Sequence, residues 1–166
     1  MSKDFHNLQD AGTQLAEILA DKPAGVIALV GQGAEIAIAI ASKFEVPVIA
    51  AVLQRNEVSH EVTGVDVEPV TSEGLFYVVD DAVETGHTTL AAWSVLQAAG
   101  YRNLKLAVPV CPRDSASALL PVVGEIVAVK RPMVRRSLAW HYEKLPATSA
   151  SDALAMISRH NLALSE

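Results

Sequence analysis

The chain has 166 residues and a mildly acidic balance, with 13 Lys or Arg, 19 Asp or Glu and a net charge of −6 when the histidines are neutral. This balance disfavours general nucleic-acid binding, because an acidic surface repels a phosphate backbone. No apolar run reaches membrane-spanning length, since Gln32 and Glu35 interrupt the longest candidate, residues 25–41. The single cysteine, Cys111, excludes an internal disulfide framework, and the polar start lacks the apolar run of a signal peptide. We therefore expect a cytoplasmic protein with no membrane partner.

Strands and helices alternate along the chain. Its apolar residues (51%) are mostly small, with 26 alanines and 21 valines, and valine-rich runs are typical of a parallel sheet covered on both faces. Apolar runs predict strands at residues 26–30, 46–53, 75–79, 104–110 and 125–129. Helical spacing predicts helices at residues 8–19, 34–44, 88–99 and 152–160, and one or two turns within 114–120. Such alternation indicates βαβ units, so we predict one α/β domain over residues 1–166, a three-layer core with a parallel sheet of about five strands.

Three local features refine this pattern. Residues 54–74 have valines separated by polar residues, which is compatible with either a loose hairpin or a mobile loop. Gly100 stands where a left-handed residue closes a helix. Either Ser149 or Ser151 is expected to cap the last helix.

The chemically informative segment is a strand followed by two acids and a short loop. Asp80 and Asp81 come at the carboxyl end of the strand at 75–79, the edge where open α/β sheets bind ligands. The loop 84–89 contains Gly86 and three threonines and leads into a helix, an arrangement that presents N–H groups and hydroxyls to an anion. An acid pair beside a phosphate cradle predicts a sugar phosphate ligand. The alternative is a solvated strand end followed by an ordinary helix cap.

This segment resembles a known signature. Residues 78–81, Val-Val-Asp-Asp, followed by residues 84–88, Glu-Thr-Gly-His-Thr, resemble the phosphoribosyl-diphosphate (PRPP) binding signature of the type I phosphoribosyltransferases. Residues 5–41 and 139–143 resemble the start and the Trp-Tyr-acid segment of a small bacterial subgroup. The resemblance implies a hood built from the two chain ends and a homodimer. It also implies Mg²⁺-dependent transfer of the 5-phosphoribosyl group from PRPP to a nucleobase-like acceptor, with release of pyrophosphate, as in nucleotide salvage.

The resemblance also implies roles for individual residues. Asp80 and Asp81 would bind the ribose hydroxyls, with Mg²⁺ reached through the ligand or water. Arg55 and the turn at residues 31–33 would meet the pyrophosphate. A side chain at Gly86 would occupy the place of the 5-phosphate. The residues expected to hold that phosphate are Glu84, Thr85, Gly86, His87, Thr88 and Thr89, and those of the pyrophosphate turn are Gly31, Gln32 and Gly33.

Other candidate residues have two readings each. Glu84 is either the general base that takes the acceptor's proton or a solvated loop acid. Trp140 and Tyr142 either stack the acceptor base or anchor the core. The basic run 130–136 is a solvated face or a dimer contact, unless Lys130, Arg131, Arg135 or Arg136 supplies charge to the site.

Two departures from the family pattern leave a second function open. Gln32 stands where several relatives have Arg or Lys, and residues 56–101 carry eight acids but no Lys or Arg. These features favour a non-catalytic PRPP- or nucleotide-binding regulatory protein over an enzyme, whereas the intact acid pair and Glu84 favour the enzyme. A doubly wound domain that binds another phosphate ligand is a third, weaker hypothesis. The sequence does not identify the acceptor.

Overall fold

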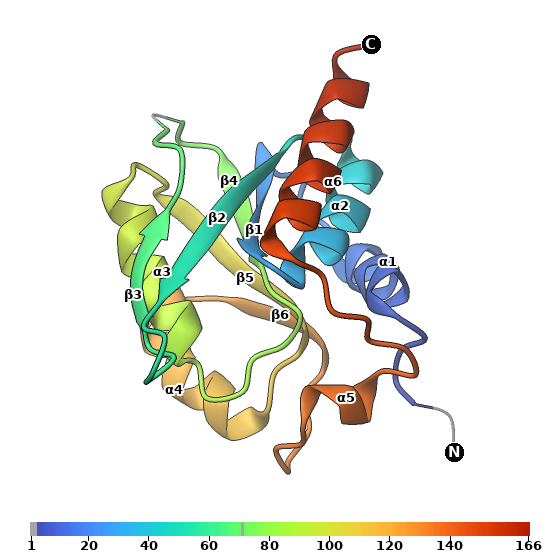
Figure 1. The fold of residues 1–166 in the computed structure, drawn as a ribbon, viewed down its shortest axis with the longest axis vertical. Helices are drawn as coiled ribbons and strands as arrows, with labels where there is room; N and C mark the ends of the chain where they lie inside the picture. Colours follow the sequence, from blue (N-terminus) through green and yellow to red (C-terminus); the bar gives the residue numbers. More distant parts are fainter. Residues whose placement is uncertain (1–2, 71) are drawn as a thin grey trace.

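A six-stranded sheet with helices on both faces forms the protein (Figure 1). The structure is a computed structural model that describes residues 3–70 and 72–166, so that Met1 and Ser2 of the polar start lie outside it. The strands are β1 (Gly25–Val30), β2 (Val48–Arg55), β3 (Val62–Asp66), β4 (Leu75–Val79), β5 (Asn103–Val110) and β6 (Ile126–Lys130). The helices are α1 (Leu8–Ile18), α2 (Gly33–Phe44), α3 (His87–Ala98), α4 (Arg113–Val123), α5 (Leu138–His141) and α6 (Ala150–Leu164).

The strand order β3-β2-β1-β4-β5-β6 confirms the predicted α/β class. Each pair of neighbours is parallel except β2 and β3, which form an antiparallel hairpin with a register shift between Gln54 and Arg55. The sheet therefore has the five predicted strands, all parallel, and a sixth antiparallel strand at its edge. Of the two alternatives for residues 54–74, a loose hairpin or a mobile loop, the structure has the hairpin. Because β1 and β4 are central, the loops at their carboxyl ends meet at one edge of the sheet.

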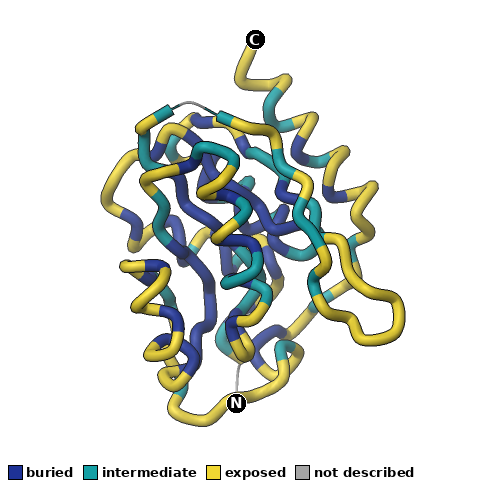
Figure 2. Tube along the Cα trace, turned by 90° about the vertical axis from the view of Figure 1, so that its left-hand side faces the viewer, coloured by how far each residue is buried: buried dark blue, intermediate teal, exposed yellow. Residues whose placement is uncertain are grey.

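The two faces of the sheet carry separate apolar clusters. In β1, Val26 and Ala28 face the cluster that includes α1, α2 and α6, whereas Ile27 and Leu29 face the cluster that includes α3 and α4. All six residues of β1 are buried, as expected for a central parallel strand, and the buried strands lie inside a more exposed outer layer (Figure 2). In the second cluster, Trp93 of α3 is only 2% exposed. Gly100 follows α3 with φ +105°, which confirms the predicted left-handed closure.

Two helices differ from the prediction in length. α4 runs for eleven residues rather than one or two turns, because Ala116, Leu119 and Val123 recur at helical spacing and bury one face. Pro121 falls in its last turn. α6 has fifteen residues and is longer than the predicted 152–160. It begins after Ser149, whose hydroxyl accepts from the N–H of Asp152, so Ser149 rather than Ser151 is its cap. None of the helices in the described ranges is long and apolar enough to cross a membrane.

The two chain ends meet in the predicted hood. Phe5 forms a parallel bridge with Tyr142: its N–H donates to the His141 carbonyl at 3.0 Å, and its carbonyl accepts from the N–H of Glu143 at 2.9 Å. Side chains reinforce the bridge, since His141 pairs with Asp4 at 2.7 Å and His6 pairs with Glu143. We call residues 4–6 together with 141–144 the terminal clip. It fixes the hood beside the carboxyl edge of the sheet.

Candidate active site

A cavity of about 420 Å³ opens at the carboxyl ends of β1, β2 and β4. It brings together the acid pair, the phosphate loop, part of the glycine turn and Arg55, which are separated by up to 58 residues in the chain. The residues that line it are Leu29, Val30, Gly31, Gln32, Leu53, Arg55, Asp80, Asp81, Ala82, Val83, Glu84, Thr85, Gly86, Thr88, Thr89 and Leu138. Gly33 and His87 are next in sequence to lining residues and were predicted to belong to the site, but they are not part of this lining.

Asp80 and Asp81 are half-buried at the end of β4, and the Asp80 carboxylate accepts the N–H of Asp81 at 2.8 Å. Burial raises the pKa of Asp80 well above its usual range, and the negative charge of Asp81 raises it further. Burial also raises the pKa of Asp81, while hydrogen bonds from its surroundings oppose that rise. Two neighbouring carboxylates that resist ionisation form a site that a cation or hydroxyl donors would stabilise.

The phosphate loop 84–89 runs into the first turn of α3, and Gly86 is the residue just before that helix. Gly86 has φ +93°, a left-handed conformation that favours glycine. A Cβ at this position would lie 2.9 Å from Cδ2 of Leu119 in α4, so contact with Leu119 is a further reason for glycine here, besides the predicted closeness of the 5-phosphate. Thr88 and Thr89 follow in the first turn of α3, where backbone N–H groups have no partner inside a helix and are available to an anion.

Arg55 is the only Lys or Arg in the lining described above, beside three acids. Its guanidinium donates to the His60 carbonyl at 2.9 Å and to the Thr88 hydroxyl at 3.2 Å. The hydroxyl hydrogen of Thr88 stays free for a ligand, because the hydroxyl acts as acceptor towards Arg55. Arg55 therefore connects the β2–β3 hairpin to the phosphate loop as well as bringing positive charge to the cavity.

The glycine turn lies against the segment that precedes α6. The side-chain carbonyl of Gln32 accepts the N–H of Thr148 at 3.3 Å, and a Cβ on Gly31 would lie 3.0 Å from the Thr148 carbonyl oxygen. A Cβ on Gly33 would lie 3.0 Å from the Val79 carbonyl oxygen, where α2 approaches the end of β4. The C-terminal segment thus covers one side of the turn that was assigned to pyrophosphate.

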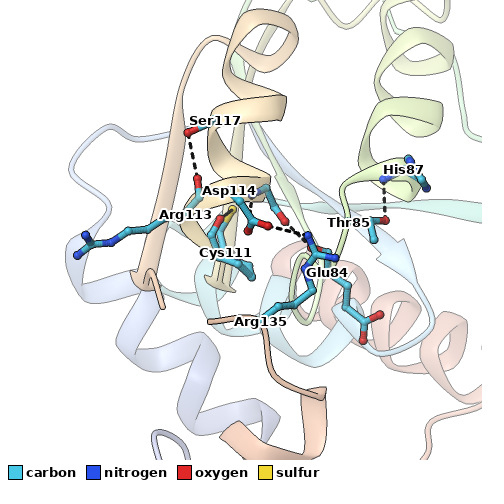
Figure 3. Close-up of polar contacts among 10 residues, drawn as sticks. Glu84, Thr85, His87, Cys111, Arg113, Asp114, Ser117 and Arg135 are labelled. Carbon is cyan, nitrogen blue, oxygen red and sulfur yellow. Dashed lines mark hydrogen bonds and ion pairs between the residues drawn. The ribbon is translucent and has the colours of Figure 1, made fainter. Parts of the chain in front are cut away.

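Glu84 lines the cavity, and its backbone is held by a residue that the sequence analysis did not single out. The buried Ser115, in the first turn of α4, donates its hydroxyl to the Glu84 carbonyl. Next to it, Asp114 pairs with Arg135 at 2.9 Å, so Arg135 lies beside the loop without lining the cavity (Figure 3). The position of Asp114 and Ser115 just after β5, at the ligand edge, is the sequence signal that could have identified them.

The structure does not bring the hood aromatics into the cavity. Trp140 is 47% exposed, outside the lining, and the Arg136 guanidinium lies 4.9 Å from its ring centre. Tyr142 is 2% exposed and packs on Phe5 with ring centres 5.2 Å apart, which favours core anchoring over base stacking among its two predicted roles, since a covered ring has no free face for a base. Leu138 is the hood residue in the lining, and the four basic residues of 130–136 are all outside it.

Comparisons with known proteins bear on the class of protein to which this fold belongs. Two Mycobacterium tuberculosis proteins, each named "Putative phosphoribosyl transferase", are 30% identical over 96 residues, which is 58% of this chain. The match covers 21% of those proteins, so the chain corresponds to about a fifth of their length. No protein-family model matches the chain.

Solved structures match over more of the chain. The TT1426 protein of Thermus thermophilus has a TM-score of 0.78 at 20% identity, covering 93% of this chain and 98% of its own. Orotate phosphoribosyltransferase from Aeropyrum pernix has a TM-score of 0.60 at 23% identity, covering 73% and 69%. A hypothetical protein from Neisseria gonorrhoeae, solved with bound ppGpp, has a TM-score of 0.60 at 18% identity, covering 99% and 98%.

The fold is that of the phosphoribosyltransferases: a mostly parallel six-stranded sheet between helices. The similarity in sequence to the two mycobacterial proteins points to the same class. The resemblance of this chain to the type I phosphoribosyltransferase family is therefore confirmed.

Proposed function

We propose that residues 1–166 form one phosphoribosyltransferase domain that transfers the 5-phosphoribosyl group of PRPP to a nucleobase-like acceptor and releases pyrophosphate. The supporting observation is the single cavity in which Asp80, Asp81 and the loop 84–89 meet Arg55 and the turn at 31–32. The acid pair corresponds to the ribose hydroxyls of PRPP, and the loop 84–89 corresponds to its 5-phosphate. Arg55 and the turn at 31–32 correspond to its pyrophosphate.

Each group has a defined task in this reaction. The first turn of α3 and its threonine hydroxyls bind the 5-phosphate, while Asp80 and Asp81 accept hydrogen bonds from the ribose hydroxyls. Positive charge develops on the sugar as negative charge builds on pyrophosphate, so holding the charged ends in place favours the transition state. The Glu84 carboxylate takes the proton that the acceptor nitrogen loses.

The donor set fits Mg²⁺, which prefers oxygen ligands and keeps several waters or substrate oxygens in its shell. The acid pair supplies carboxylate oxygens whose ionised form burial disfavours, so a nearby cation would stabilise it. Within residues 3–70 and 72–166, no three His, Cys, Asp or Glu side chains form a metal-binding cluster. Bound together with PRPP, Mg²⁺ would neutralise the leaving pyrophosphate.

Titration calorimetry with PRPP, with and without Mg²⁺, tests ligand binding, and pyrophosphate release with a panel of purines and pyrimidines tests turnover. We expect Mg²⁺-dependent binding that the double variant Asp80→Asn, Asp81→Asn abolishes. As a matched control, Asp66→Asn, at an exposed position of the edge strand β3, should bind normally. Absence of PRPP binding by the unmodified protein would exclude this function.

A second candidate is a PRPP- or nucleotide-binding regulatory protein without catalysis. The shortage of positive charge supports it, because Arg55 is the one basic residue among the lining residues named above and faces three acids. The Neisseria gonorrhoeae protein of similar fold was solved with bound ppGpp, a nucleotide ligand. Metal-dependent binding without pyrophosphate release, for every acceptor in the panel, would identify this candidate.

We also propose a homodimer, on the family resemblance. Sedimentation velocity at several protein concentrations tests it, and a single species of monomer mass throughout would contradict it.

A further inference from the structure

The chain has three tyrosines, and each is buried with its hydroxyl bonded to a backbone carbonyl. Tyr77 donates to Asp21 at 2.8 Å, Tyr101 donates to Glu68 at 2.7 Å, and Tyr142 donates to Asp81 at 3.1 Å. Only the third acceptor belongs to the proposed site, because Asp81 lines the cavity. Tyr142 therefore reaches the acid pair through its backbone, from a segment 61 residues away.

The loop that carries the acids depends on a few tethers. Residues 80–86 have no regular secondary structure. The N–H of Val83 donates to the Val110 carbonyl at 2.9 Å, the Glu84 carbonyl accepts from Ser115, and the Asp81 carbonyl accepts from Tyr142. The Tyr142 bond is the one nearest to the carboxylates.

The acid pair needs such a tether because its two negative charges repel each other and so favour moving the carboxylates apart. Asp80 and Asp81 are adjacent, and each carboxylate raises the energy of the other when both are ionised. Burial and the two acids raise the pKa of the Tyr142 hydroxyl, so it stays protonated and remains a donor. A hydrogen bond to the Asp81 carbonyl restrains the peptide without adding or removing charge at the carboxylates.

We propose that Tyr142 is a positioning residue that holds the Asp80-Asp81 pair in the orientation that binds the ribose hydroxyls of PRPP. This inference rests on the proposed function. Tyr142 is itself fixed by the terminal clip, since it packs on Phe5 and its neighbours His141 and Glu143 pair with Asp4 and His6. The two segments of the terminal clip thereby stabilise the ligand site although neither segment lines the cavity.

Replacement of the phenol alone tests the proposal. Tyr142→Phe keeps the ring on Phe5 and removes the bond to Asp81, and we expect PRPP with Mg²⁺ to bind about 2- to 10-fold more weakly. Inorganic phosphate, measured by displacement of PRPP, should bind as before, because it requires the loop 84–89 and not the acid pair.

Tyr77→Phe is the matched control. It loses the same kind of bond, from the middle of β4 to the Asp21 carbonyl outside the site, and should destabilise the protein comparably while both affinities stay unchanged. The double variant Asp4→Asn, His6→Asn, which loosens the clip with Tyr142 intact, should weaken PRPP binding in the same direction but less.

The outcomes separate the two levels of inference. PRPP binding by the unmodified protein with an equal affinity in Tyr142→Phe would overturn the positioning role and leave the proposed function standing. An equal loss in Tyr77→Phe, or a parallel loss of phosphate affinity, would also overturn it, because the effect would then be general destabilisation. No PRPP binding by the unmodified protein would contradict the proposed function itself.

Discussion

Replacing Gly86 with alanine should destabilise the protein through two separable effects. At φ +93° any residue other than glycine is strained by about 1–2 kcal/mol. The new Cβ would also lie 2.9 Å from the buried Leu119 side chain, and overpacking of this kind typically costs about 1–3 kcal/mol. The two effects together predict a loss of about 2–5 kcal/mol in the free energy of unfolding, or about 4–20 °C in melting temperature for a protein of this size.

Gly124 provides a control without a steric contact. It has φ +78° with ψ −47°, against ψ −4° at Gly86, and a Cβ there would meet nothing within 4 Å, so Gly124→Ala should show backbone strain alone. Urea denaturation measures both losses, provided that the unfolding is two-state.

A double-mutant cycle with Leu119→Ala isolates the steric effect. Removing the Leu119 side chain creates space for the new Cβ, so the double variant should be more stable than the sum of the single losses predicts, by about 1–2 kcal/mol. No coupling between positions 86 and 119 would refute the assigned contact.

Three further substitutions test the site. Asp80→Asn should raise the free energy of unfolding of the ligand-free protein at pH 8 by about 1–3 kcal/mol and leave it nearly unchanged at pH 3. The folded-state pKa of Asp80 is raised, so stability is lost as pH rises through that value; thermal melts from pH 3 to 9 measure it. Glu84→Gln should lower turnover by about 10²–10⁴-fold with near-normal PRPP affinity, measured by pyrophosphate release and calorimetry. Arg55→Met should weaken PRPP binding by about 10- to 100-fold in calorimetry, because a charge-assisted contact is lost.

Each of these has a clear contrary result. If Asp80→Asn melts lower than the unmodified protein at pH 8, the carboxylate stabilises the fold and the reasoning from burial is wrong. Unchanged turnover in Glu84→Gln would remove Glu84 as the base and leave the solvated-acid reading. Unchanged affinity in Arg55→Met would limit that arginine to its contacts with His60 and Thr88.

Local sequence patterns predicted the elements that have continuous apolar runs or a clear end signal. β4 has the predicted bounds, and the ends of β1 and α3 lie within one residue of the prediction, because continuous apolar runs and Gly100 mark them clearly. β3 was ambiguous because it is a half-buried edge strand, whose short alternating pattern also fits a loop. α4 was underestimated because only residues 114–120 were assigned to it, although Val123 continues the apolar spacing of Ala116 and Leu119.

The site was predicted as far as its parts are neighbours in sequence. The acid pair and the phosphate loop lie within ten residues, so their joint position at the carboxyl edge followed from the strand and helix on either side. The bonds from Ser115 to Glu84 and from Tyr142 to Asp81 span 31 and 61 residues, and no local pattern encodes which hydroxyl reaches which carbonyl. Composition likewise could not tell that Tyr142 turns inward while Trp140, two residues earlier, turns to solvent.

The contrast between the two tryptophans gives the protein a built-in optical probe. Trp93 is 2% exposed and Trp140 is 47% exposed, so acrylamide in the solvent quenches the fluorescence of the second and largely spares the first. With Trp93→Phe, the remaining emission would come from the hood alone, next to the Arg136 guanidinium. Movement of the hood during ligand binding could then be followed in real time without an attached dye.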